Sequence, residues 1–494
     1  MLKQIFLPLL IICINFDTSI SQELVASAPM QIKEYESTIT IPALDMEKSL
    51  HILAISSNIL TDNNLLHLKY DPNLGKISYH ELSKPSEHTT KDVVGHMVTS
   101  ENNIELFFHR KGKDEFTILT VSGEQTTNSR TVHFKLKKEK VVQYISENNE
   151  FLMLTVQRNS SILNLYEYNG DIFEARKFDL TDERFYDEDS KRVPLSELFN
   201  NHNTATISPD LPNKAITFGK KVKIFPNKDI ITITLNNNKN ATRIIHLDKT
   251  KGVATTDYAP LPTQKFADNI SLSLKTNAFI LGKKIYSLVF SRNLMVVDIT
   301  DLVNKESVNQ FEFSPDDEMT FKSSLSSVLP IGPVSIANSN TKVKTKDAKV
   351  FFRNLKASYH TGIYAENVEH DIVVKIGGYT PPSSRGSGVF IPGTTTASMD
   401  NSGNVSISSM PPMYMGSMGF SGISGGFEKH LLLDSDTYQI LSKGFYEDIF
   451  ERVKKFNKDT KTVQFESVVN FGDYYLYGFF DKKEKTYSIV KFEK

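Results

Sequence analysis

The sequence predicts an all-β protein with the architecture of a seven-bladed β-propeller. Groups of short strands, each group about 40 residues or more in length, repeat along the chain without a helix at every step, as in propeller blades. The chain is rich in Phe (32) and Tyr (19), which favour strands. In the clearest group, residues 151–156 form an almost continuous apolar run, and residues 162–168 alternate between apolar and polar types. These patterns predict one strand covered on both faces and one that is half buried.

Seven such groups follow one another along the chain. Five lie at 49–82, 95–136, 141–180, 222–247 and 278–299. The sixth begins near Thr361 and is interrupted by a low-complexity stretch, and the seventh consists of the three C-terminal strands. A lone strand around Ile39 precedes the first group. We expect this strand to pair with the strand that ends at Phe492, so that N- and C-terminal strands close the ring and leave no exposed edge.

Few helices are expected between the strands. Residues 194–199 predict one helical turn and residues 347–355 a weak helix. Phe445, Ile449, Val453 and Phe456 recur at helical spacing in a Glu- and Lys-rich segment, which predicts an amphipathic helix. Two other folds remain open at this stage: two stacked sheets, or a smaller propeller followed by a C-terminal α+β domain from about Asp347.

The first 21 residues have the pattern of a secretory signal peptide. Lys3 precedes an apolar run of residues 5–14, and the small Ser19 and Ser21 favour cleavage before Gln22. The only cysteine, Cys13, lies within this segment, so the mature chain is expected to contain no disulfide. We therefore expect a periplasmic or secreted protein in which residues 22–494 form a single propeller-like domain.

The charge balance limits the kinds of partner. The chain has 57 basic and 58 acidic residues, and its formal net charge is -1. No strong field would attract nucleic acid, and no later stretch reaches the roughly 20 apolar residues of a transmembrane helix. The expected partner is a protein or a glycan.

The stretch 377–427 differs in composition from the rest of the chain, being rich in Gly, Ser and Met, with Arg385 and Asp400 as its only charged residues. The segments on either side of 400–403 predict a hairpin. Long irregular insertions are often functional, so we expect the partner to bind at the loop face and this insertion. The aromatic residues expected to contact it are Tyr379, Phe390, Tyr414 and Phe420.

The same insertion contains a methionine array. Met410, Met413, Met415 and Met418 offer thioether ligands of the kind that favours Cu(I), and their spacing is similar to that of copper-handling envelope proteins. His360, His370 and His430 flank the insertion and are candidate nitrogen ligands. The alternative interpretation is an adaptable apolar surface for a partner, without metal.

Other clusters of reactive residues give weaker indications. The acidic residues between Asp182 and Asp189 lack the alternation and the Gly turn of a calcium loop, and Asp434 with Asp436 fits turn chemistry. The histidines of the first two groups match no metal motif, and no nucleophile elbow, P-loop or dinucleotide fingerprint is present. Because propeller sites gather residues that are distant in sequence, a hydrolase or lyase acting on polysaccharide remains an alternative.

The strand rhythm between Met30 and Lys494 resembles that of divergent secreted propeller-like proteins of bacterial envelopes. The resemblance implies a ring-shaped binding scaffold and assigns no functional residue. With no catalytic motif in the sequence, we expect a non-catalytic interaction scaffold. A polysaccharide-acting enzyme and a Cu(I)-binding protein without other cofactor remain the alternatives.

Overall fold

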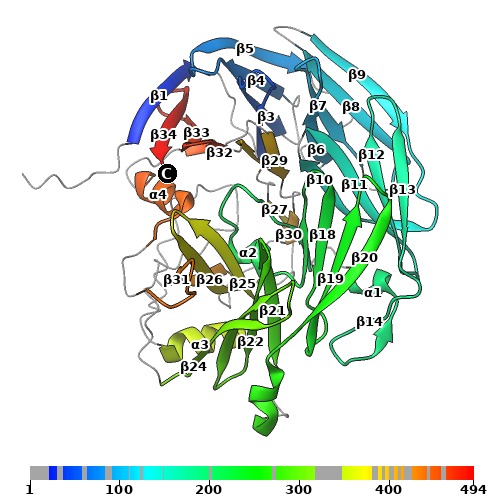
Figure 1. Cartoon of the computed structure of the whole chain (residues 1–494). Helices are drawn as coiled ribbons and strands as arrows, with labels where there is room; N and C mark the ends of the chain where they lie inside the picture. Colours follow the sequence, from blue (N-terminus) through cyan, green and yellow to red (C-terminus); the bar gives the residue numbers. More distant parts are fainter. Residues whose placement is uncertain are drawn as a thin grey trace, which may run out of the picture.

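The computed structural model shows a ring of β-sheets around a central axis (Figure 1). It describes residues 22–494 apart from a set of internal segments. Those segments are 31–36, 58–63, 84–91, 111, 123–125, 148, 200–202, 270–273, 317–347, 381–387, 392–394, 400–404, 410–412, 417–424, 442–445 and 458–462. Among the described residues, seven sheets form the blades of the ring, which confirms the predicted fold class.

The first three blades are regular four-stranded antiparallel sheets whose strands run in chain order from the axis to the rim. Blade 1 consists of β2 (Ser37–Leu44), β3 (Leu50–Ser57), β4 (Asn64–Tyr70) and β5 (Lys76–Ser83). Blade 2 consists of β6 (Val93–Val98), β7 (Ile104–Phe108), β8 (Glu115–Ser122) and β9 (Thr126–His133). Blade 3 consists of β10 (Glu139–Glu147), β11 (Glu150–Gln157), β12 (Ile162–Tyr168) and β13 (Phe173–Asp179).

Blades 4 and 5 follow the same plan, with one addition to blade 4. Blade 4 consists of β17 (Val222–Phe225), β18 (Ile230–Leu235), β19 (Ala241–Asp248) and β20 (Val253–Pro260). Inside it, β16 (Thr204–Thr206) pairs parallel with β17. Blade 5 consists of β21 (Lys275–Leu281), β22 (Lys284–Phe290), β23 (Met295–Asp301) and β24 (Ser307–Phe313). The small hairpin β14 (Phe185–Tyr186) and β15 (Arg192–Val193) lies between blades 3 and 4 in sequence.

The last two blades depart from the regular pattern. Blade 6 has three strands, β25 (His360–Val368), β26 (Asp371–Thr380) and β31 (Gly425–Asp434). Blade 7 consists of β32 (Val463–Phe471), β33 (Tyr474–Asp481), β34 (Thr486–Glu493) and the outer strand β1 (Gln22–Pro29). The insertion between β26 and β31 contributes β27 (Gly388–Ile391), β28 (Thr395–Met399), β29 (Val405–Ser409) and β30 (Met413–Gly416).

Strands from both ends of the chain close the ring, as predicted, but the N-terminal strand is not the one expected. The strand around Ile39 is β2, and Ile39 pairs with Ile55 inside blade 1. The closing strand is β1, in which Gln22 pairs with Phe492. Because β1 is a partly exposed outer strand with few buried apolar residues, its alternation is weak and the sequence pattern does not predict it.

The helices lie between blades and confirm the three predicted helical segments. They are α1 (Leu195–Leu198), α2 (Ala215–Phe218), α3 (Ala348–Ala357) and α4 (Ile449–Phe456), with a 3-10 helix at Thr263–Asn269. A capping box begins α4, since the Asp448 side chain accepts from the Glu451 backbone N–H and the Glu451 side chain from that of Asp448. The buried Ile449 and Val453 of α4 pack with Tyr477 and Phe492 of blade 7.

The two ends of the ring carry different connections. Tight turns such as β2–β3 at Asp45, β6–β7 at Thr99 and β32–β33 at Gly472 lie at one end, which we call the turn face. The longer connections from β5 to β6 and from β26 to β31 join strand ends at the opposite end, which we call the loop face. No helix among the described residues is long and apolar enough to cross a membrane.

Candidate binding site at the centre of the ring

Part of the predicted insertion lies inside the ring. Strands β28 and β29 form an antiparallel hairpin that pairs Met399 with Val405, which confirms the hairpin predicted around 400–403. Strand β28 also pairs parallel with β32, the innermost strand of blade 7, with Ser398 opposite Asn470. The hairpin further contacts the innermost strands β2 and β10 of blades 1 and 3. It therefore occupies the ring centre, where Figure 1 shows β29.

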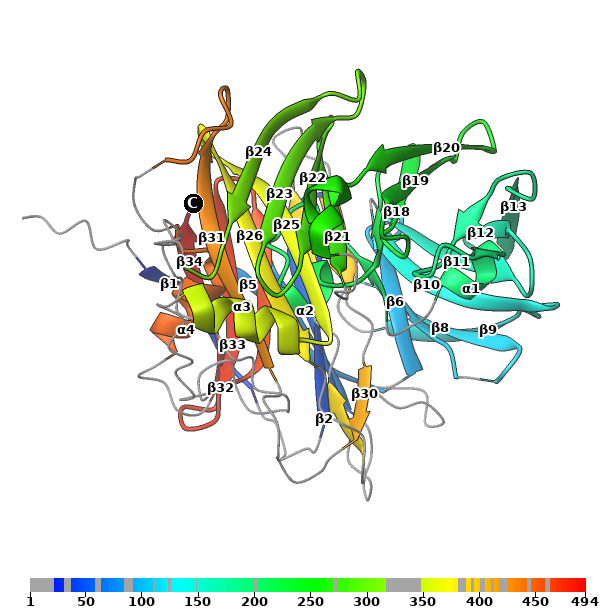
Figure 2. The ribbon, with the colours of Figure 1, turned by 90° about the horizontal axis from the view of Figure 1, so that it is seen from below.

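Strands β27 and β30 continue this hairpin outward. We call β28 and β29 its inner half and β27 and β30 its outer half. Ile391 pairs with Met413 in one ladder and Thr395 pairs with Ser409 in the next. Three residues separate the two ladders on each side, so both belong to one register. Since β28 runs parallel to β32, the outer half of the hairpin lies toward the loop face, and Figure 2 shows β30 at that end of the ring.

The structure brings two of the predicted binding residues together. Phe390 and Tyr414 are directly opposite each other in the β27–β30 ladder. Tyr379 lies elsewhere: it is on β26, only 1% exposed, and stacked against His360 in the core. Phe420 lies outside the described residues.

The methionine array is described only in part. Met413 and Met415 lie on β30, opposite Ile391 and Val389, whereas Met410 and Met418 lie outside the described residues. The flanking histidines do not converge on one point. His360 and His430 are buried in blade 6, whereas His370 lies in the β25–β26 turn at the other end of that blade. Cu(I) binding by the methionines stays a prediction.

The blade interface nearest to α4 holds a buried ionic cluster that the sequence did not reveal. Lys375 on β26 is fully buried, and its Nζ lies 2.7 Å from Asp448 Oδ2 and 3.2 Å from Glu366 Oε1. Lys214, which precedes α2, contacts the same Asp448 oxygen at 2.8 Å and Glu428 Oε1 at 3.7 Å. Burial opposes the ionisation of Asp448, but the two ammonium groups outweigh it and hold its pKa well below the usual range. The cluster joins blade 6, α2 and α4.

Glu451 adjoins this ionic cluster, and its surroundings favour the neutral carboxyl group. Burial and the neighbouring Asp448 carboxylate raise its pKa to about 8. A neutral Glu451 still accepts from the Asp448 backbone N–H at 3.2 Å and completes the capping box of α4. These residues come from segments far apart in sequence, and no local motif announces that they meet.

Two histidines of the first strand group, His51 and His67, form a buried series of hydrogen bonds in blade 1. His51 Nε2 lies 3.1 Å from Asp45 Oδ2, and His51 Nδ1 lies 2.9 Å from His67 Nε2. Burial, together with the charges of His51 and His80, lowers the pKa of His67 to about 3. Asp45 also accepts from two backbone N–H groups of its own turn. The hydrogen bonds between Asp45, His51 and His67 therefore anchor the β2–β3 turn at the turn face.

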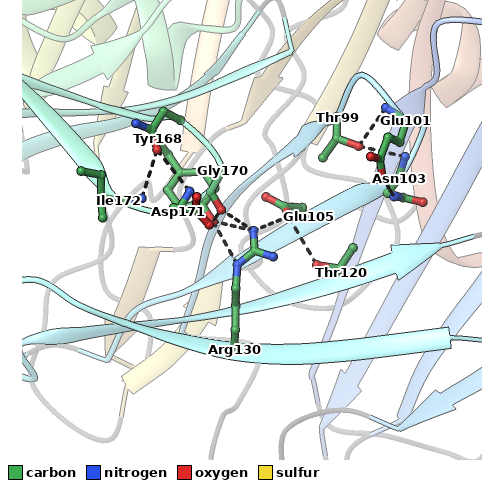
Figure 3. Close-up of polar contacts among 11 residues, drawn as sticks. Thr99, Glu101, Asn103, Glu105, Thr120, Arg130, Tyr168, Gly170, Asp171 and Ile172 are labelled. Atoms are coloured by element: carbon green, nitrogen blue, oxygen red, sulfur yellow. Dashed lines mark hydrogen bonds and ion pairs between the residues drawn. The ribbon is translucent and has the colours of Figure 1, made fainter.

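A second polar cluster joins blades 2 and 3 at the turn face (Figure 3). Arg130 on β9 donates to Glu105 Oε1 at 2.6 Å, to the Tyr168 hydroxyl at 2.5 Å and to the Gly170 carbonyl at 2.9 Å. Burial raises the pKa of Glu105, although Arg130 opposes this shift. The guanidinium satisfies groups from both blades, so we read the cluster as a structural clamp.

The acidic and turn motifs have structural roles. Asp187 accepts from the backbone N–H groups of Asp189 and Lys191, and Glu188 pairs with Lys221. Asp434 accepts from the backbone of Asp436 and Thr437, which confirms the predicted turn chemistry. No group of three or more His, Cys, Asp or Glu residues in the described part of the chain is arranged to hold a metal ion.

Comparisons with known proteins add little to this geometry. No protein-family model and no curated protein match the sequence. Among solved structures, the Nup133 β-propeller domain of Vanderwaltozyma polyspora is similar over 94% of this chain and 100% of its own, at 10% identity and a TM-score of 0.32. The dihydro-heme d1 dehydrogenase NirN is similar over 96% of this chain and 78% of its own, at 8% identity and a TM-score of 0.30.

A mutant of the Synechocystis apocarotenoid oxygenase is similar over 57% of this chain, at 8% identity and a TM-score of 0.31. The match spans 63% of the oxygenase, less than two thirds of its length. At these scores none of the three supports an argument about function.

Proposed function

We propose that this protein is a ring-shaped, non-catalytic interaction scaffold that binds a protein partner at its loop face. The observation that supports this proposal is the single hairpin of β27–β30, whose inner half lies against β32, β2 and β10 while its outer half lies toward the loop face. A binding segment whose inner half is fixed by the ring is partly pre-organised, which reduces the entropy lost on binding.

The residue types on the outer half suit a protein surface. Phe390 and Tyr414 form a cross-strand pair flanked by Val389, Met413 and Met415, and no charged residue lies in either strand. Aromatic and methionine residues are enriched in the cores of protein interfaces, where charged residues are depleted. A periplasmic or secreted location, as expected from residues 1–21, would make the partner an envelope or extracellular protein.

The test compares two matched double variants of the full chain as baits for affinity capture and mass spectrometry. Phe390→Ser with Tyr414→Ser changes the outer half of the hairpin. The control, Ile172→Ser with Val303→Ser, changes residues on turns at the turn face that are 57% and 74% exposed. We expect a protein that wild type and control retain to be lost from the hairpin variant. Equal capture by all three, with their melting temperatures unchanged, would place the interaction elsewhere.

A further inference from the structure

An arginine in α4 is buried without the partners that such a group requires. Arg452 is 7% exposed, and its Nη1 donates to the Glu493 carbonyl oxygen. Within the described part of the chain, its Nε and Nη2 atoms have no hydrogen-bond partner and the side chain forms no ion pair. A buried, unpaired guanidinium is costly, and such groups in native structures commonly mark the place of a bound water or ion.

Two tyrosines close to Arg452 add further donors. The Tyr446 and Tyr475 side chains lie within electrostatic range of the Arg452 guanidinium and of each other. Both residues are half-buried, and neither hydroxyl forms a hydrogen bond with another part of the chain that the structure describes. The Lys494 ammonium lies 5.2 Å from the centre of the Tyr475 ring. The group of Arg452, Tyr446, Tyr475 and Lys494, which we call the Arg452 cluster, therefore offers several donors and two positive charges.

Four carboxylates near the Arg452 cluster are paired with other lysines. Glu447 pairs with Lys455, and Glu493 pairs with Lys491 at 2.6 Å. Glu366 and Asp448 belong to the ionic cluster and contact Lys375. Asp210 and Asp473 lie within electrostatic range of Lys494. Glu447 and Glu493 attract the Arg452 guanidinium from a distance, but no carboxylate in the described part of the chain forms an ion pair with it.

We propose that the Arg452 cluster is a binding site for a small oxyanion, such as an inorganic phosphate or the phosphate group of a larger ligand. The planar guanidinium can donate from Nε and Nη2 to two oxygens of one oxyanion, and a phosphate has further oxygens to accept from the tyrosine hydroxyls. The site lies between α4 and blade 7, near the C-terminal end of β34 at the turn face. The site is separate from the outer half of the hairpin and does not depend on the proposed scaffold function.

Inorganic phosphate is the probe for this site. Thermal unfolding of the full chain is followed at pH 7 while phosphate replaces chloride at constant ionic strength, and the affinity is measured by calorimetry. A ligand that binds only the folded state raises the melting temperature as its concentration exceeds the dissociation constant. We expect such a rise for wild type and an affinity roughly tenfold to hundredfold lower for Arg452→Met, as for the loss of a hydrogen bond to a charged group.

Two further variants make the result decisive. Tyr475→Phe removes one hydroxyl and keeps the ring, so it should weaken phosphate binding even if Arg452→Met folds poorly. Arg176→Met removes a surface arginine on β13 that is paired with Glu167, and it should leave the phosphate response unchanged. No rise for wild type beyond the chloride control, or an equal rise in Arg452→Met and Tyr475→Phe, would overturn the proposal.

Discussion

The main chains of Gln22 and Phe492 lie opposite each other in the antiparallel ladder that closes the ring. This ladder extends from Gln22 to Pro29 and gives blade 7 its fourth strand. Because β1 and β34 come from opposite ends of the chain, the ring can close only after both have been made. The stability of the whole ring should therefore depend on β1.

Ala28 and Leu24 provide a matched test of this dependence within one strand. Ala28 is completely buried, whereas Leu24 is 61% exposed. Ala28→Asp would bury an unpaired carboxylate and should destabilise the protein by roughly 3 kcal/mol or more. Leu24→Asp should change the free energy of unfolding by no more than about 0.5 kcal/mol. Chemical denaturation measures both, and similar effects of the two substitutions would contradict the role assigned to β1.

The buried ionic cluster should be much more sensitive to mutation than surface ion pairs. Lys375→Met leaves Glu366 without its lysine and Asp448 with only Lys214. Breaking a buried pair in this way should cost about 3–5 kcal/mol.

The control for this substitution is Lys177→Met, which removes an exposed pair with Asp179 and should cost no more than about 1 kcal/mol. Denaturant midpoints that fall equally in the two variants would show that the cluster does not hold α4 and blade 6 together.

Glu451 predicts a pH dependence at the alkaline side. Its pKa is about 8 in the folded protein against an ordinary value of 4.5, so the folded state keeps a proton that the unfolded state has lost. Below about pH 4.5 Glu451 is protonated in both states and does not change the stability. As the pH rises from 4.5 to 8, its retained proton lowers the free energy of unfolding progressively.

Glu451→Gln keeps an uncharged acceptor and lacks this titration. Its melting temperature relative to wild type should therefore increase between pH 5 and pH 8 and level off above. A constant difference across this range would show that Glu451 is ionised in the folded protein.

His67 predicts the opposite dependence at the acidic side. Its pKa is lowered from 6.5 to about 3 by burial and by the neighbouring His51, His80 and Lys69. Protonation therefore favours the unfolded state, and stability that is fully present above pH 6.5 is lost as the pH falls toward 3.

His67→Gln should flatten the loss of melting temperature between pH 6.5 and pH 4. His133→Gln serves as the control, because its side chain is 83% exposed and lies on the outer strand of blade 2. Parallel pH profiles for wild type and His67→Gln would mean that His67 is not kept neutral by the fold.

The sequence predicts the blades well because their signals are local. Alternation and apolar runs mark strands such as β11 and β12, and apolar residues at helical spacing in a Glu- and Lys-rich segment mark α4. Pairing between distant segments is not a local property. Gln22 with Phe492, and Ser398 with Asn470, each join strands whose own sequences do not specify the partner.

The same reason explains why the sequence does not predict the ionic cluster or the Arg452 cluster. Lys214, Lys375 and Asp448 are ordinary charged residues in their own segments, and only the ring brings their side chains within 3 Å. Arg452 is likewise one of several charges on an amphipathic helix, and its isolation is visible only in the folded chain. In contrast, the insertion was recognised because its composition differs from the rest of the sequence.

The most direct test of the account concerns the position of the hairpin in the ring. Ser398→Cys and Asn470→Cys, introduced together with Cys13→Ser, place two cysteines at paired positions of β28 and β32. We expect mild oxidation to link them, as shown by peptide mass spectrometry. In a control chain, Ser398→Cys is combined with Thr255→Cys on the outer strand of blade 4, and no link should form. Absence of the first link, or equal yields in both chains, would contradict a hairpin fixed at the centre of the ring.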